Sequence, residues 1–433
     1  MADRLLKQLD DVDRRNFMAN MARACLGVSV LPAIQTASPM VAWAQEAAKK
    51  ARAKQVIYLY MSGGMTHIDT FDPKPKNSDV QGPLKPLQTK VPGILIGEHL
   101  PKLAQLMDKI TIVRSMNTNQ GAHGPGSYLA HTSYAPRATI RHPAMGAWAM
   151  NFLGKINPDI PGNVVIAGSS NHPGAGFMEL KHGPLPIGDP RVGIPNAKLL
   201  RGVDEREFYS RLSLVAKFGE AFLKRYPQKK VKGYGEMYVD AIRLMKSEDL
   251  KAFNINEEDQ ESKDRFGADR FGQACLLARR LIERGVRFIE VGHGGWDTHN
   301  ENFDAMATRL PILDQALSSL ITDLESRGLL KTTLIVLTSE FGRSPKINER
   351  NGRDHHPAAY SSLLIGGGVK GGHVHGSSDE DAHYVDTDEM FVANFNATIA
   401  YAMGMPIKKI VYSGTRRPFR VADEGEPVMS IFA

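Results

Sequence analysis

The sequence of 433 residues contains only two cysteines, Cys25 and Cys275. If the amino-terminal segment is removed in the cell, Cys275 remains alone and no disulfide can form within the chain. Cys275 lies in the amphipathic run FGQACLLARRLIERG, where we expect a small buried hydrophobic residue rather than a nucleophile. The cysteine content therefore excludes a fold held together by disulfides.

The sequence also lacks an apolar run that could span a membrane. The apolar stretch near the amino terminus is short and is interrupted by Pro32, so we predict no permanent membrane span. Arg14 and Arg15 precede this stretch, Phe17 follows them, and Ala42-Trp43-Ala44 supplies small residues for a signal peptidase. This pattern resembles a twin-arginine (Tat) signal peptide at residues 1–44. We predict export to the periplasm or secretion; the alternative is an amphipathic helix that stays attached.

A concentrated basic stripe is missing as well, although the net charge is +7. Lysine and arginine are scattered along the chain and are not interleaved with aromatic residues. Nucleic-acid binding is therefore not expected. Attraction of a small anionic substrate is compatible with this charge.

Short apolar runs of strand length are present, and most of them are continuously apolar, as in strands that are covered on both faces. These runs are 55–61, 110–116, 163–168, 286–292, 332–339 and 361–368. The segment 310–328 has helical periodicity, ends at Gly328 and leads directly into the next strand. Repeated units of this kind predict an α/β fold with a doubly wound, mostly parallel sheet flanked by helices. The Pro/Gly-rich and then charged region at about 171–260 is predicted to be an inserted cap.

Polar residues of metal-binding type follow four of these strands, and ligands bind beyond the carboxyl ends of strands in such sheets. Each residue has an ordinary explanation alone: Asp69 could cap a turn, and Glu340 could pair with Arg343. Four such segments together predict one site of imidazoles and carboxylates. The four groups are His67, Asp69 and Asp72; His123, Ser127 and His131; His293, Asp297 and His299; and Glu340, Arg343, Asp354, His355 and His356.

The ordered motifs GGMTHIDTFDPKP, HPAMGAWAMNFLG, GGWDTHNEN, TSEFGRSPKIN and GRDHHPAAYSSLLIGGGVKGG resemble those of the DUF1501 family. That family comprises exported bacterial proteins of the alkaline phosphatase/sulfatase-like superfold, and the resemblance covers residues 45–433. It implies an alkaline phosphatase-like domain with a metal centre. The ligands that it implies are Asp297, His299, Glu340, either His355 or His356, and either His67 or Asp69.

The conventional nucleophile of that superfold is not present. The segment NQGAHGPGSYLAHT places His123 in or near its position and Ser127 one turn later, and no Cys-x-Pro-x-Arg motif of a formylglycine sulfatase exists. For His123 the sequence leaves three roles open: metal ligand, covalent nucleophile, or acid/base. A metal ion that lowers the pKa of bound water to about 7 would remove the need for a side-chain nucleophile.

The resulting hypothesis is an exported metal-dependent hydrolase of phosphate esters, with sulfate esters less favoured. Zinc is the expected metal, with manganese or calcium as alternatives. Arg343 would stabilise the anionic ester group, and His123 would protonate the leaving oxygen. The expected partner is a small anionic ester or a sulfated or phosphorylated glycan. The alternative is a non-catalytic protein of the same superfold that binds a metal or an anionic glycan.

Overall fold

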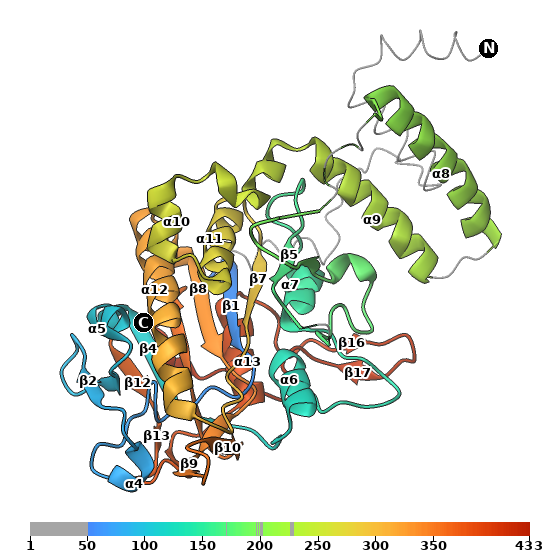
Figure 1. The fold of residues 1–433 in the computed structure, drawn as a ribbon. Coiled ribbons are helices and arrows are strands. Elements are labelled where there is room, and N and C mark those ends of the chain that lie inside the picture. Colours follow the sequence, from blue (N-terminus) through green and yellow to red (C-terminus); the bar gives the residue numbers. More distant parts are fainter. Residues whose placement is uncertain (1–50, 170, 196, 198, 200–201, 226–228) are drawn as a thin grey trace, which may run out of the picture.

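A computed structural model describes residues 51–433 except 170, 196, 198, 200–201 and 226–228, so the predicted signal peptide at 1–44 lies outside the described residues. A nine-stranded sheet forms the centre of the molecule (Figure 1). Its order is β12-β4-β11-β8-β1-β7-β5-β6, and β15 also pairs with β4. The strands are β1 (Gln55–Met61), β4 (Ile110–Asn117), β5 (Asn163–Ile166), β6 (Leu185–Ile187), β7 (Phe288–His293), β8 (Thr333–Thr338), β11 (Tyr360–Gly366), β12 (His373–His375) and β15 (Met390–Phe391).

The sheet is parallel except for one strand. β1 runs parallel to β7 and β8, and β5 runs parallel to its neighbours β7 and β6. β11 is antiparallel to both of its neighbours, β8 and β4. The reversal has a simple cause: a hairpin, β9 (Gly342–Ile347) with β10 (Arg353–His356), connects β8 to β11, and no crossover helix lies between them. The predicted α/β class with a mostly parallel sheet is confirmed, and all six predicted strands belong to this sheet.

Helices cover both faces of the sheet, because alternate side chains of β1 enter two different cores. Ile57, Leu59 and Met61 pack with α5 (Pro101–Gln105), α11 (Arg270–Glu283) and α12 (Asn302–Ser326). Val56 and Tyr58 pack on the other side with α6 (His123–Thr132), α7 (Met145–Leu153) and α13 (Val392–Ala402). Burial on both faces explains why the strand sequences are continuously apolar. The doubly wound arrangement is therefore confirmed.

Short elements complete the fold around the edges of the sheet. Two helices are α4 (Ser78–Gln81) and α10 (Gln260–Phe266). Three hairpins are β2 (Pro86–Gln88) with β3 (Leu95–Gly97), β13 (Ser377–Ser378) with β14 (Val385–Thr387), and β16 (Val411–Tyr412) with β17 (Pro418–Phe419). The 3-10 helices are η1 (Met107–Lys109), η2 (Leu180–His182), η3 (Glu248–Phe253), η4 (Ile255–Glu257), η5 (Leu330–Thr332) and η6 (Met429–Ile431).

The region that the sequence predicts as an insertion, 171–260, contains both sheet and projecting elements. β6 lies in this region and pairs with β5, so part of the region belongs to the central sheet. Two long helices follow, α8 (Glu205–Arg225) and α9 (Lys229–Lys246), and they extend away from the body, α8 farther than α9 (Figure 1). Among the described residues, no helix combines the length and the apolar character that crossing a membrane requires.

Candidate metal centre

Several predicted site residues meet beyond the carboxyl ends of β4, β7 and β8. His123 is the first residue of α6, which follows β4. Asp297 and His299 lie in the loop after β7, and Glu340 follows β8. The β9–β10 hairpin adds Arg343 and His355, which are paired residues of the two strands. The parallel sheet brings these segments to one edge although they are distant in the sequence.

Each of three histidines is fixed through its Nδ1 atom. His123 Nδ1 lies 2.8 Å from Glu340 Oε1, and His299 Nδ1 lies 2.7 Å from Asp354 Oδ1. His355 Nδ1 lies 2.8 Å from the carbonyl oxygen of Gly121. All three partners are acceptors, so Nδ1 carries a proton and Nε2 points into the cluster. Carboxylates and carbonyls orient metal-binding histidines in this way.

The three Nε2 atoms converge on the carboxylate of Asp297. Those of His299 and His355 lie 3.1 and 3.2 Å from Oδ1, and that of His123 lies 3.2 Å from Oδ2. The Nε2 atoms of His299 and His355 are themselves only 3.0 Å apart. Two lone pairs at this distance repel each other unless a cation lies between them or one ring takes a second proton. The donor set therefore fits a divalent metal ion.

Asp297 is held as a carboxylate. Partial burial works to raise its pKa, but the hydrogen bond and charge of Arg343 outweigh burial and lower the pKa to about 2. Arg343 Nη2 lies 2.5 Å from Asp297 Oδ1. The other guanidinium contacts are carbonyl oxygens, with Nε bound to Gly64 and Nη1 to Arg353. Arg343 is fully buried, so its hydrogen bonds position Asp297 and the surrounding backbone.

Glu340 acts as an acceptor for the groups around it. Besides His123, it receives hydrogen bonds from the backbone N–H of Gly63 at 2.9 Å and from the hydroxyl groups of Tyr60 at 2.9 Å and Ser339 at 3.2 Å. Burial raises its pKa, but the hydrogen bonds from His123, from its own backbone N–H, from Gly63 and from Tyr60 outweigh burial and lower it. In return, the hydrogen bond to Glu340 raises the pKa of His123. Both Glu340 oxygens are thus engaged, and one of them fixes His123.

Three of the predicted ligands are not brought into this cluster. Asp69 is fully buried and forms an ion pair with Arg353, at 2.9 Å between Oδ2 and Nε. His67 Nε2 lies 3.0 Å from the carbonyl oxygen of Ala382, and His356 Nε2 lies 2.5 Å from that of His383. His67 and Asp69, in the segment after β1, therefore contact the β10 strand and the 379–384 loop instead of the cluster. The backbone N–H of Gly63, which also follows β1, contacts the cluster through its hydrogen bond to Glu340.

Sequence reasoning missed a second cluster of titratable side chains, formed by Glu290, His131 and His172. Glu290, in the middle of β7, contacts His131 Nε2 and His172 Nε2, each at 3.1 Å. Ser127 lies between the clusters, because its side chain hydrogen-bonds to Tyr60 and its carbonyl oxygen lies 2.6 Å from His131 Nδ1. A carboxylate inside the apolar run VRFIEVG was the available signal, since a buried charge requires a partner.

His131, His172 and Glu290 also lie close enough together to hold a metal ion, but their hydrogen bonds can be satisfied by protons alone. The backbone N–H of Gly174 donates to His172 Nδ1 at 3.1 Å, which places the proton of His172 on Nε2, facing Glu290. His131 faces an acceptor on each side, Ser127 and Glu290, so it is a double donor. Burial opposes that protonation, but Glu290 outweighs burial and raises the pKa of His131. The cluster is therefore a buried ion pair with a second histidine bound to it.

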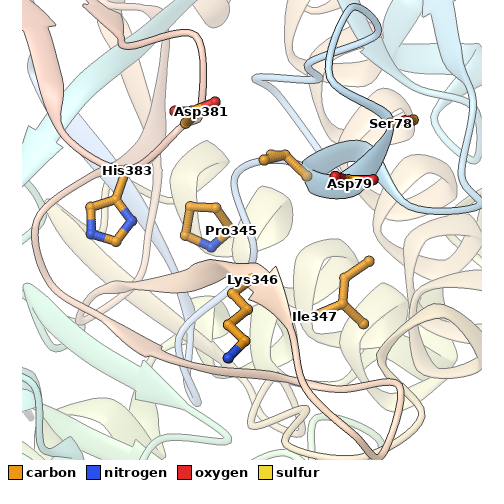
Figure 2. A pocket seen from close by; sticks show the side chains of 8 residues that line it. Ser78, Asp79, Pro345, Lys346, Ile347, Asp381 and His383 are labelled. Atoms are coloured by element: carbon orange, nitrogen blue, oxygen red, sulfur yellow. The ribbon is translucent and has the colours of Figure 1, made fainter.

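A surface cavity of about 650 Å³ lies beside the β9–β10 hairpin (Figure 2). It is lined by Ser78, Asp79, Val80, Pro345, Lys346, Ile347, Asp381 and His383. Pro345, Lys346 and Ile347 belong to β9, which also carries Arg343. In Figure 2 the α4 residues face the loop of Asp381 and His383 across this strand. The cavity mixes acidic and basic groups, so its charge alone does not select an anion.

Fold and site together define a class: an α/β protein with imidazoles and carboxylates of metal-binding type at the carboxyl edge of a mostly parallel sheet. Residues 53–432 match the family described as "Protein of unknown function (DUF1501)". The chain belongs to this family, and the resemblance of its motifs is confirmed. No curated protein matches the sequence.

Several solved structures resemble the chain. The PsFucS1 sulfatase from Pseudoalteromonas sp. is 12% identical, with 96% of this chain and 78% of that chain covered and a TM-score of 0.39. The phosphonate monoester hydrolase SpPMH from Silicibacter pomeroyi is 13% identical, with 88% and 76% covered and a TM-score of 0.40. The lipoteichoic acid synthase LtaP from Listeria monocytogenes is 8% identical, with 90% and 79% covered and a TM-score of 0.37. These remote likenesses assign no substrate to this chain.

Proposed function

We propose that the protein is a metal-dependent hydrolase that acts on phosphate esters outside the cytoplasm, with sulfate esters as the less favoured substrates. The observation that supports this most is the approach of His299 Nε2 and His355 Nε2 to each other and to Asp297. These three side chains would hold the ion, and zinc suits such a set best, with manganese or calcium as alternatives. A bound divalent ion would polarise an ester oxygen and lower the pKa of a water molecule.

His123 is proposed to carry the proton of the reaction. Its Nδ1 is tied to buried Glu340, and its Nε2 faces the outer oxygen of Asp297 rather than the shared oxygen of the other two histidines. Glu340 raises the pKa of His123, which suits a group that gives a proton to the leaving alcohol. Glu340, predicted from the sequence as a ligand, is then a positioning residue.

Arg343 and Ser127 also receive roles different from those expected. Arg343 is buried and occupied by Asp297 and by backbone carbonyls, so we assign it to positioning rather than to contact with the ester. Ser127 hydrogen-bonds to Tyr60 and is not proposed as the nucleophile. Water is the proposed attacking group.

The test separates the metal ligand from the proton carrier. We expect purified protein to contain bound metal, His355→Ala to lose it, and His123→Ala to keep it while turnover falls roughly 10²–10⁴-fold. The assays are elemental analysis and a screen of phosphate monoesters, phosphate diesters and sulfate esters with zinc, manganese or calcium. Equal metal loss in both variants would make His123 a ligand. Metal-loaded protein that hydrolyses no ester but binds an anionic glycan would support the non-catalytic alternative.

Export is proposed on the sequence signal alone. Replacing Arg14 and Arg15 by lysine should leave the precursor in the cytoplasm, as shown by cell fractionation and by the mass of the amino terminus. Unchanged export of this variant would argue against the Tat pathway. Removal of residues 1–44 would give an amino terminus at Gln45.

A further inference from the structure

The excess positive charge of residues 51–433 is concentrated in the two projecting helices. α8 contains five basic and three acidic residues, and α9 contains five basic and two acidic residues, which gives the pair a net charge of +5. Residues 1–50 contain seven basic and five acidic residues, so they account for the other two charges of the net +7. The rest of the chain is therefore neutral overall. The helix pair is the basic part of the molecule.

α8 also exposes a stripe of apolar side chains on its outer surface. Leu214, Phe218 and Phe222 recur at every fourth position and thus share one face of the helix, with Val215 beside them. Their exposed fractions are 54%, 73% and 53%, and that of Val215 is 50%. We call these four residues the outer stripe. Surface apolar residues are common singly, but a contiguous stripe indicates an interaction surface.

Basic side chains border the outer stripe. Arg211 lies three residues before Leu214, and Arg225 lies three residues after Phe222, so both fall on the same side of the helix. Lys217 lies next to Phe218 in the sequence and is exposed. Long basic side chains can lie along an apolar surface while their charges reach an anionic one. A helix with this pattern is typical of proteins that lie in a membrane interface.

We propose that the α8–α9 helix pair docks on an anionic phospholipid surface, with the outer stripe inserted among the lipids. Its position at the far end of the molecule leaves it accessible without obstruction by the sheet (Figure 1). The net charge of +5 would attract anionic headgroups. The outer stripe would bury apolar area that a soluble anion cannot cover. This inference is independent of the proposed hydrolase activity.

Other partners fit the helix pair less well. Nucleic acids and anionic glycans would pair with the basic residues but would leave Leu214, Val215 and Phe218 exposed to water. A second copy of the chain could cover the stripe, but two helix pairs of like charge would repel each other. An anionic membrane satisfies the charge and the apolar stripe together.

Vesicle binding by the full chain tests the proposal. We expect binding to vesicles of phosphatidylcholine mixed with phosphatidylglycerol, and weaker binding to phosphatidylcholine alone. The double variant Leu214→Ser/Phe218→Ser should bind at least about tenfold more weakly, and Lys217→Gln about fivefold more weakly on anionic vesicles. Tyr412→Ser is the matched control, because Tyr412 is 64% exposed on the body of the molecule. Equal binding by the double variant and the control would overturn the proposal.

A local probe excludes binding through residues 1–50 as the explanation. Phe218→Cys in a Cys25→Ser background, labelled with an environment-sensitive dye, should show a blue-shifted emission on anionic vesicles, whereas Tyr412→Cys should not. Cys275 is buried and should remain unlabelled. An unshifted probe at position 218 would overturn the proposal. Self-association through the stripe without lipid would also overturn it, in favour of a second copy as the partner.

Discussion

The substitution Gly63→Ala tests whether the backbone after β1 sets the position of Asp297. Gly63 has a φ of +121°, which L side chains rarely adopt, and a Cβ atom there would lie 2.5 Å from the backbone nitrogen of Asp297. It would also lie 2.8 Å from the carbonyl carbon of Trp296. Neither atom is the end of a flexible side chain, so the loop that carries Trp296 and Asp297 must itself move.

The magnitude follows from these distances. To reach 3.4 Å, where ordinary contact begins, the Cβ and the Asp297 nitrogen must separate by 0.9 Å, the difference from 2.5 Å. The strained backbone conformation costs roughly 1–3 kcal/mol of unfolding free energy. Displacing a carboxylate on which three imidazoles converge should weaken metal binding roughly 10- to 100-fold, as when groups that orient ligands are changed.

Gly93→Ala is the matched control, because Gly93 has a φ of +85° and nothing lies within 4 Å of its added Cβ. Both variants should lose stability in urea denaturation, but only Gly63→Ala should bind zinc more weakly in calorimetry. If Gly63→Ala binds zinc as tightly as the Gly93→Ala protein, the backbone contact does not position Asp297 and the reasoning fails.

Two further predictions concern the buried ion pairs. Asp69→Asn leaves Arg353 buried without its charge partner and should lower the unfolding free energy by about 3–5 kcal/mol in urea denaturation; a loss below about 1 kcal/mol would contradict this. Glu290→Gln should destabilise mainly where the Glu290–His131 pair is charged. The pKa of Glu290 is lowered from 4.5 and that of His131 is raised from 6.5, so the pair contributes fully between these values. Its contribution is lost above the raised pKa of His131 and below the lowered pKa of Glu290. Urea titrations of both proteins from acidic to alkaline pH should show this window, and a pH-independent difference would contradict it.

Much of the fold could be predicted because the strands are buried on both faces. The run QVIYLYM coincides with β1, Gln55–Met61. Both faces of this strand are buried, so nearly all of its residues are apolar and the strand is recognisable as one continuous run. The antiparallel direction of β11 was not predicted. Its sequence is as apolar as that of the parallel strands, and its direction depends on the hairpin that precedes it rather than on its composition.

The site was predicted in part, for a geometric reason. Residues after parallel strands must meet at one edge, which brought His123, Asp297 and His355 together, with ligand atoms within 4.8 Å of one another. Local sequence does not show which way each side chain turns. His355 faces Asp297 whereas His356, the next residue of β10, contacts His383, because neighbouring residues of a strand point to opposite sides.

The two histidine clusters differ in the location of their protons, which residue types do not reveal. In the second cluster a backbone N–H holds the Nδ1 of His172, so its Nε2 proton satisfies Glu290 and no cation is needed. In the first cluster acceptors hold the Nδ1 atoms of His299 and His355, and their Nε2 atoms face each other at 3.0 Å beside the carboxylate of Asp297. The second cluster is complete as it stands, whereas the first brings two ring nitrogen atoms together with no donor between them and so fits a cation. The groups behind the imidazoles, among them the carboxylate of Asp354 and the carbonyl oxygen of Gly121, therefore favour the first cluster as the candidate metal site, and their positions depend on loops whose course is fixed only when the sheet has formed.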